Sequence, residues 1–141
     1  MRVVLDTNVI VAAFASRGLC SEVFEVCIAE YTIVTSEYIL SEVKEKLIHK
    51  VHLTRSISLA VIDYLREITE IFKPEHVDTH ICRDIDDVKI IGTAMSGKAR
   101  FIITGDEDLL VLKKYGGLEI ITPREFWSRL KGIKKSRLNF S

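Results

Sequence analysis

Four acidic residues of this chain are placed where their side chains could do chemistry together. Asp6 and Asp106 each follow a short apolar run, Asp87 opens a segment of helical pattern, and Glu42 lies inside another. In a parallel sheet, side chains that follow the strands meet at one edge. A cluster of oxygen donors without His or Cys suits hard cations such as Mg²⁺ or Mn²⁺, which polarise phosphodiesters and activate water. The pattern therefore favours metal-dependent phosphodiester hydrolysis.

Each of these acids also has an ordinary structural explanation. Asp6, Asp87 and Asp106 all stand where a helix could begin, and Asp is a favoured N-cap that contributes about 1 kcal/mol. Glu42 could form an ion pair with Lys46, one helical turn later. For any single Asp, capping is the better explanation. The functional interpretation therefore depends on whether the four side chains converge.

The elements that would position these acids are predicted by hydrophobic patterning. Short segments rich in Val, Ile and Thr predict strands over Val3–Leu5, Thr32–Thr35, Phe101–Thr104 and Glu119–Thr122. Their near-continuous apolarity is typical of strands covered on both faces. Thr69–Phe72 is either a fifth strand or the end of the preceding helix.

Helical patterns fill most of the chain between these strands. The predicted helices are Ser21–Glu30, Ser36–His49, Ile57–Ile68, Asp87–Ser96, Leu109–Tyr115 and Arg124–Leu130. Within its helix, Glu42 lies beside Ile39 and Val43, so it borders the buried stripe and can lean over the sheet edge. The alternation predicts an α/β fold with a mostly parallel sheet of four to five strands.

Composition sets the broad class of the protein. The chain of 141 residues, 48% hydrophobic and 28% charged, predicts one folded domain over residues 1–141. Three Cys without a CxxC pair fit a reducing compartment, and no apolar run is long enough for a bilayer, so we expect a cytoplasmic protein with no membrane segment. Five basic residues and no acid follow Glu125. The basic tail from about residue 131 is either a solvated terminus or a phosphate-contacting arm.

The motifs around the four acids resemble those of the PIN-domain family, the small nuclease fold found in VapC-type toxins of toxin–antitoxin pairs. The opening strand carries an Asp followed by Thr-Asn, a helix carries the Glu, a second helix carries an Asp seven residues before an Ala, and a Thr-x-Asp-x-Asp signature follows. The segments are Val4–Val9, Ser36–Val43, Asp87–Ala94 and Thr104–Leu110, and Ile121–Phe126 resembles the ending of the branch described as putative toxin components.

This resemblance implies a three-layer α/β/α fold, Mg²⁺- or Mn²⁺-dependent endoribonuclease activity, frequent homodimerisation and a small antitoxin that covers the acidic cleft. It assigns metal binding or orientation of the attacking water to four residues and supporting roles to others. The four are Asp6, Glu42, Asp87 and Asp106; Asn8 and Thr104 are supporting residues, and Asp84 and Asp108 are additional candidate ligands. Asp87 is preferred over Asp84 by its spacing to Ala94, and Asp86 is expected to face solvent.

The sequence is also compatible with other functions. A PIN-like domain could serve only as an interaction module, or as an RNA-processing or structure-specific nuclease without an antitoxin. A zinc site through His76, His80 and Cys82 is a weaker alternative, because the segment follows Pro74 and lacks a helical period. Basic residues at the rim, Lys89 or those of the C-terminal arm, would hold RNA by its phosphates.

Overall fold

The computed structural model describes residues 1–78 and 84–139, with side chains through residue 132. In this part of the chain, six strands form one sheet in the order β3-β2-β1-β4-β6-β5. Neighbouring strands are parallel except for the antiparallel pair of β5 and β6. The strands are β1 (Arg2–Leu5), β2 (Thr32–Thr35), β3 (Thr69–Ile71), β4 (Phe101–Ile103), β5 (Lys114–Tyr115) and β6 (Leu118–Ile121).

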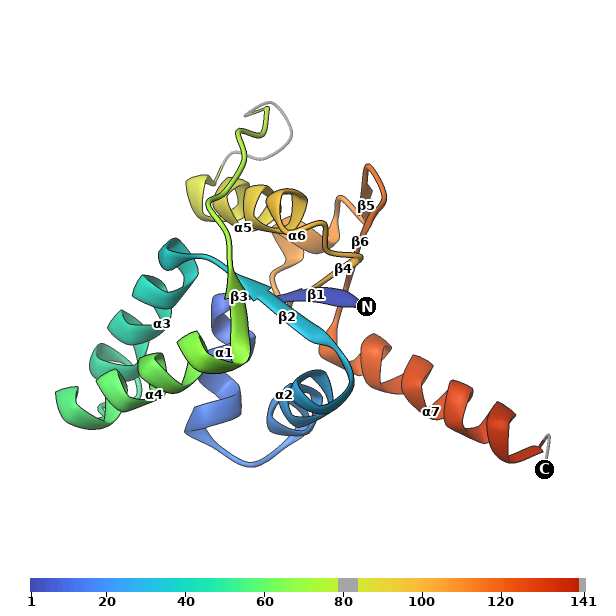
Figure 1. The fold of residues 1–141 in the computed structure, drawn as a ribbon, viewed down its shortest axis with the longest axis horizontal. Helices are drawn as coiled ribbons and strands as arrows, with labels where there is room; N and C mark the ends of the chain where they lie inside the picture. Colours follow the sequence, from blue (N-terminus) through green and yellow to red (C-terminus); the bar gives the residue numbers. More distant parts are fainter. Residues whose placement is uncertain (79–83, 140–141) are drawn as a thin grey trace.

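Helices cover both faces of the sheet, as Figure 1 shows. Helix α5 packs on β1, β2 and β4 on one face, whereas α1, α2 and α7 lie on the other face. Helices α3 and α4 pack against each other beside the β3 edge. The bounds are α1 (Thr7–Ala15), α2 (Leu19–Glu30), α3 (Glu37–His49), α4 (Arg55–Ile68), α5 (Ile85–Ser96), α6 (Glu107–Leu110) and α7 (Pro123–Asn139). The predicted α/β class and three-layer arrangement are confirmed.

The central strand of the sheet, β1, is buried. Val3, Val4 and Leu5 of β1 are each 0% exposed, as expected for a parallel strand covered on both faces. Helix α5 lies so close to the preceding segment that a Cβ at Gly92 would come within 2.4 Å of the Glu75 carbonyl oxygen. The absence of a Cβ at Gly92 thus allows α5 to lie directly against the segment that follows β3.

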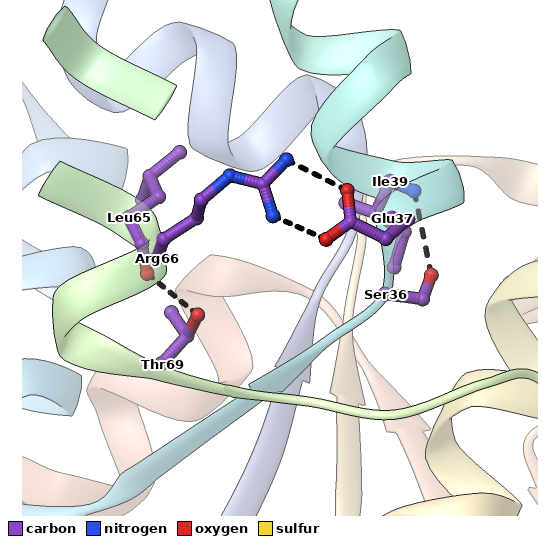
Figure 2. Close-up of polar contacts among 6 residues, drawn as sticks. All are labelled: Ser36, Glu37, Ile39, Leu65, Arg66 and Thr69. Atoms are coloured by element: carbon purple, nitrogen blue, oxygen red, sulfur yellow. Dashed lines mark hydrogen bonds and ion pairs between the residues drawn. The ribbon is translucent and has the colours of Figure 1, made fainter. Parts of the chain in front are cut away.

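An ion pair joins the two helices beside the sheet edge. Arg66 of α4 binds the Glu37 carboxylate of α3 with both terminal nitrogens of its guanidinium, one of them at 2.7 Å (Figure 2). Ser36 caps α3 by accepting a hydrogen bond from the Ile39 backbone N–H. These contacts set where α3 begins.

The local structure differs from the prediction in two places. Helix α1 was not among the predicted helices. Its run Val9–Ile10–Val11 consists of β-branched residues that favour strands, and burial against α2 and α3 overrides that preference. A helix over Leu109–Tyr115 was predicted, but α6 ends at Leu110. Lys114–Tyr115 instead forms β5, which turns through Gly116–Gly117 into β6 and adds a sixth strand.

The remaining differences concern ambiguous or terminal segments. Of the two possibilities for Thr69–Phe72, the strand is observed, as β3. The last helix was predicted to end at Leu130, but α7 continues to Asn139 and projects from the body of the molecule (Figure 1). The basic segment is thus helical as far as it is described. No described helix combines the length and apolarity that crossing a membrane requires.

Candidate active site

The pairing of β1 with β4 brings two site residues together. Leu5 pairs with Ile103, so Asp6 and Thr104 are the next residues beyond each strand. The buried Thr104 hydroxyl donates to Asp6 Oδ2 at 2.6 Å and accepts the Asp106 backbone N–H at 3.0 Å. One hydroxyl therefore links the acid that follows β1 to the acid that follows β4.

The capping explanation holds for some acids and fails for others. Asp106 caps α6, because its Oδ1 accepts the Asp108 backbone N–H at 3.0 Å. Asp84 caps α5 through the Asp86 N–H, which places Asp87 inside the helix instead of at its start. Asp6 precedes α1 but forms no side-chain capping bond with it. Helix capping therefore does not explain Asp6 and Asp87, two carboxyl groups that are only 5% and 3% exposed.

Helix α3 supplies one wall of the site. Tyr38, Glu42 and Lys46 recur every four residues and therefore share a helix face, and all three line the same cleft. The Tyr38 hydroxyl donates to Asp86 Oδ1. Lys46 does not pair with Glu42 as the spacing suggested; its Nζ donates to Asn8 Oδ1 at 2.8 Å.

The four predicted acids converge on one cleft of about 200 Å³. Asp84, Asn8 and Thr7 line it as well, whereas Asp108 is exposed and does not. Asp86 was expected to face solvent, but it is half-buried, lines the cleft and accepts the Tyr38 hydroxyl. The cleft is lined by Asp6, Thr7, Asn8, Tyr38, Glu42, Lys46, Asp84, Asp86, Asp87, Ile90 and Asp106.

Crowding of carboxylates changes their protonation. Burial, repulsion from Asp106 and a hydrogen bond shared with Asp106 raise the pKa of Asp87 from 3.8 to about 7. Burial also raises the pKa of Asp6, although the hydrogen bond from Thr104 opposes the change. Burial and the hydrogen bond to Asp86 raise the pKa of Tyr38, which keeps it protonated. The cleft therefore holds more negative charge than its own groups neutralise.

A family model described as PIN domain matches residues 2–108. The chain belongs to the PIN-domain family. All four predicted acids fall inside the matched range, whereas β5, β6 and α7 follow it. No curated protein matches the chain.

Solved structures support the same fold. VapBC2 from Rickettsia felis, bound to a DNA fragment from its promoter, superposes with a TM-score of 0.61 at 16% identity, over 86% of this chain and 98% of that one. VapBC-1 from nontypeable Haemophilus influenzae gives a TM-score of 0.60 at 17% identity, over 88% and 99% of the two chains. At these identities the similarity establishes the three-layer architecture of this PIN domain.

The donor set of the PIN-domain cleft fits a hard divalent cation in its chemistry. Its acidic lining offers carboxylate oxygens, and burial together with repulsion from neighbouring carboxylates makes two of the carboxyl groups take up protons more readily than usual. Within the described residues, however, no three His, Cys, Asp or Glu side chains stand in an arrangement that could already hold a metal ion. Binding would therefore require rotation of carboxylate side chains.

The zinc alternative gains no support from the described residues. His76 is exposed, and His80 and Cys82 lie outside the part of the chain that the structure describes. Lys89, considered for the rim, does not line the cleft.

Two cleft residues, Tyr38 and Lys46, were missed by the sequence interpretation as members of the site. Their signal was present, because both stand four residues from Glu42 on a helix and so project from its face. Once Glu42 is a candidate, i−4 and i+4 are the positions to inspect.

Proposed function

We propose that this PIN-domain protein is a Mg²⁺- or Mn²⁺-dependent ribonuclease that hydrolyses RNA phosphodiester bonds and acts as the toxin of a toxin–antitoxin pair. The observation that carries the proposal is the convergence of Asp6, Glu42, Asp87 and Asp106 on one cleft from four separate places in the chain. Burial and, after it, repulsion between carboxylates raise the pKa of Asp6 and Asp87, and a divalent cation would relieve this repulsion.

Each acidic residue of the cleft has a role that follows from its position. Asp6 would hold the cation, and the hydrogen bond from Thr104 to its Oδ2 fixes the carboxylate plane. Asp87 and Asp106, which share a hydrogen bond, would hold the cation as well. Glu42, on the α3 wall, would complete the set or accept a proton from the attacking water. A bound Mg²⁺ or Mn²⁺ supplies Lewis acidity toward the phosphate and a more acidic water.

An antitoxin protein and RNA are the partners that we expect for this chain. The two similar structures are VapBC assemblies, which supports a small antitoxin partner for this chain. Its expected effect is to cover the acidic cleft, and a homodimer is the expected state of the toxin. The basic C-terminal part of α7 would contact RNA phosphates without reading sequence.

Asp6→Asn tests the assignment. The amide keeps the shape of the carboxylate but removes its charge, so Mn²⁺-dependent cleavage of single-stranded RNA should fall by about 100-fold or more. Circular dichroism should show an unchanged fold. Asp63→Asn on α4 makes the same chemical change at an exposed site outside the cleft and should cleave like wild type.

Thermal melting in millimolar Mn²⁺ adds a readout that needs no RNA. A cation that binds only the folded state raises the melting temperature of the wild type and of Asp63→Asn, but raises that of Asp6→Asn less. Undiminished RNA cleavage by Asp6→Asn would contradict the ribonuclease proposal.

A further inference from the structure

Lys46 is the single Lys or Arg among the described residues that line the acidic cleft. Six carboxylates line the same space: Asp6, Glu42, Asp84, Asp86, Asp87 and Asp106. A cation at this position acts on the whole cluster, and it is among the groups that lower the pKa of Asp6.

The ammonium group of Lys46 is not consumed by an ion pair. Among the described side chains, no carboxylate oxygen lies within 4.0 Å of Lys46 Nζ, although Glu42 stands one helical turn before it. Its hydrogen-bond partner is the neutral Asn8 Oδ1, at 2.8 Å. Since an ammonium has three N–H donors, this contact leaves two of them and the full charge for another acceptor.

The same contact orients Asn8. Lys46 can only donate, so the amide of Asn8 must turn its oxygen toward Lys46 and its NH₂ group away from it. Asn8 is exposed and lies two residues after Asp6, at the start of α1. Two groups of N–H donors, one charged and one neutral, therefore stand side by side where the cleft opens, next to the acids.

We propose that Lys46 and Asn8 together bind the non-bridging oxygens of the RNA phosphate in the cleft. A phosphodiester carries a negative charge and would be repelled by the ionised carboxylates of the cleft. A Lys ammonium is a compact phosphate-binding charge, and the oriented amide adds a second donor that fixes the phosphate in place. In this arrangement Lys46 supplies positive charge that would otherwise have to come from an additional divalent ion. The inference rests on the proposed ribonuclease function.

Lys46→Met removes the charge and keeps the length of the side chain. We expect kcat/KM for cleavage of a single-stranded RNA in Mn²⁺ to fall by about 10-fold to 100-fold, the loss expected for one charge-assisted hydrogen bond. Lys46→Arg keeps the charge and should recover most of this loss. Lys44→Met is the matched control, because Lys44 is on the same helix but does not line the cleft, and its kcat/KM should be that of wild type.

Mn²⁺ affinity without RNA separates phosphate binding from a structural role. Removing a positive charge from the cleft should leave Mn²⁺ binding by Lys46→Met equal to wild type or tighter, as followed by melting temperature against Mn²⁺ concentration. If Lys46 merely braced α1 through Asn8, the same variant would bind Mn²⁺ more weakly and melt earlier. That result would overturn the inference.

The pairing of the two residues gives a second check. Asn8→Ala should also lower kcat/KM, and the double variant should lose less than the two single losses combined, because either change disturbs the same phosphate contact. Strictly additive losses would contradict a shared contact. If the wild-type protein cleaves RNA and Lys46→Met is equally active, only this inference is overturned. If the wild-type protein does not cleave RNA, the proposed function is overturned as well.

Discussion

The hydroxyl of Thr104 occupies an unusual position among the buried residues of the site. It donates to the carboxylate of Asp6 and accepts from the backbone of Asp106, so one side chain joins two loops that follow neighbouring strands. Thr35 provides an instructive contrast at the end of β2. It is 1% exposed, and within the described part of the chain its hydroxyl has no hydrogen-bond partner.

Thr104→Val and Thr35→Val should therefore have opposite consequences. Both replace a buried hydroxyl by a methyl group, but the first leaves a buried carboxylate without its donor and should lower the free energy of unfolding by about 1–3 kcal/mol. The second removes an unsatisfied polar atom and should be neutral or stabilising. Urea denaturation of the two variants measures the difference; equal costs would show that the Thr104 bonds contribute nothing.

Protonation of Asp87 gives the metal-free protein a distinct pH dependence. The pKa of Asp87 is raised from 3.8 to about 7, first by burial and then by Asp106. The folded state thus binds this proton more tightly than the unfolded state, and the stability from this group is complete below pH 3.8 and is lost as the pH rises through about 7. Asp6, whose pKa is also raised, acts in the same direction. Glu37 and Glu119, with lowered pKa, act oppositely but only at more acidic pH.

In EDTA, the free energy of unfolding should therefore decrease between about pH 5 and pH 8. Asp87→Asn cannot release the proton and should flatten this decrease, while Asp63→Asn should not. Added Mn²⁺ should stabilise the protein more at the alkaline end, since metal and proton compete for the same oxygens. A wild-type stability that rises across this range in EDTA would exclude the proposed coupling.

Helix α3 connects the edge of the sheet to the cleft. Its start is held inside the molecule by Ser36, which is 0% exposed, accepts the Ile39 N–H and receives a hydrogen bond from Thr93 of α5 at 2.9 Å. On the outside, Glu37 pairs with Arg66 of α4 (Figure 2). Both interactions act on the first turn of α3, but the Ser36 hydrogen bonds are buried whereas both side chains of the ion pair are exposed to solvent.

Ser36→Ala should consequently cost more stability than Arg66→Gln. Loss of a buried cap with two hydrogen bonds is expected to cost about 1–2 kcal/mol, whereas solvated ion pairs contribute about 1 kcal/mol or less. Chemical denaturation ranks the two variants. Ser36→Ala should also reduce RNA cleavage, because Glu42 and Lys46 belong to the helix that Ser36 caps. A larger loss of stability in Arg66→Gln than in Ser36→Ala would contradict this ranking.

The sequence was most informative where one physical signal dominated. The apolar strands before Asp6 and Asp106 predicted the edge at which both acids emerge, and the helix-border position of Glu42 predicted its inclination toward that edge. Helix α1 escaped prediction because its β-branched run forms a helix only when packed against α2 and α3, a tertiary effect.

Partner choice was the feature that the sequence could not specify. The spacing of Glu42 and Lys46 suits an ion pair, yet Lys46 donates to Asn8, which is 38 residues away along the chain. Asp86 looked like a solvent-facing neighbour of Asp87 until the fold placed Tyr38 opposite it. Both outcomes depend on how α3 lies against α1 and α5, which no local pattern encodes.

At the scale of the whole molecule, a net charge of zero hides a strong segregation. Residues 1–108 carry 12 Lys or Arg against 18 Asp or Glu, whereas residues 109–141 carry eight against two. The acidic cleft lies beyond the carboxyl ends of the strands, and the basic excess belongs largely to α7, which projects from the body (Figure 1). A polyanion would thus meet attraction at α7 and repulsion at the cleft, apart from Lys46 and any bound cation.

Neutralising the end of α7 should therefore weaken RNA binding through its salt-dependent part. In an Asp6→Asn background with EDTA, Lys134→Gln/Lys135→Gln should lower affinity for single-stranded RNA and reduce the slope of log K against log salt by about 1.4, the value for two lost phosphate contacts. Lys50→Gln/Lys73→Gln removes the same charge from exposed sites on the α3 and β3 side of the sheet and should leave the slope nearly unchanged. Fluorescence anisotropy across a salt series measures both. Equal slopes for the two double variants would show that α7 is a solvated terminus, because its lysines would then release no more counterions than surface charge elsewhere.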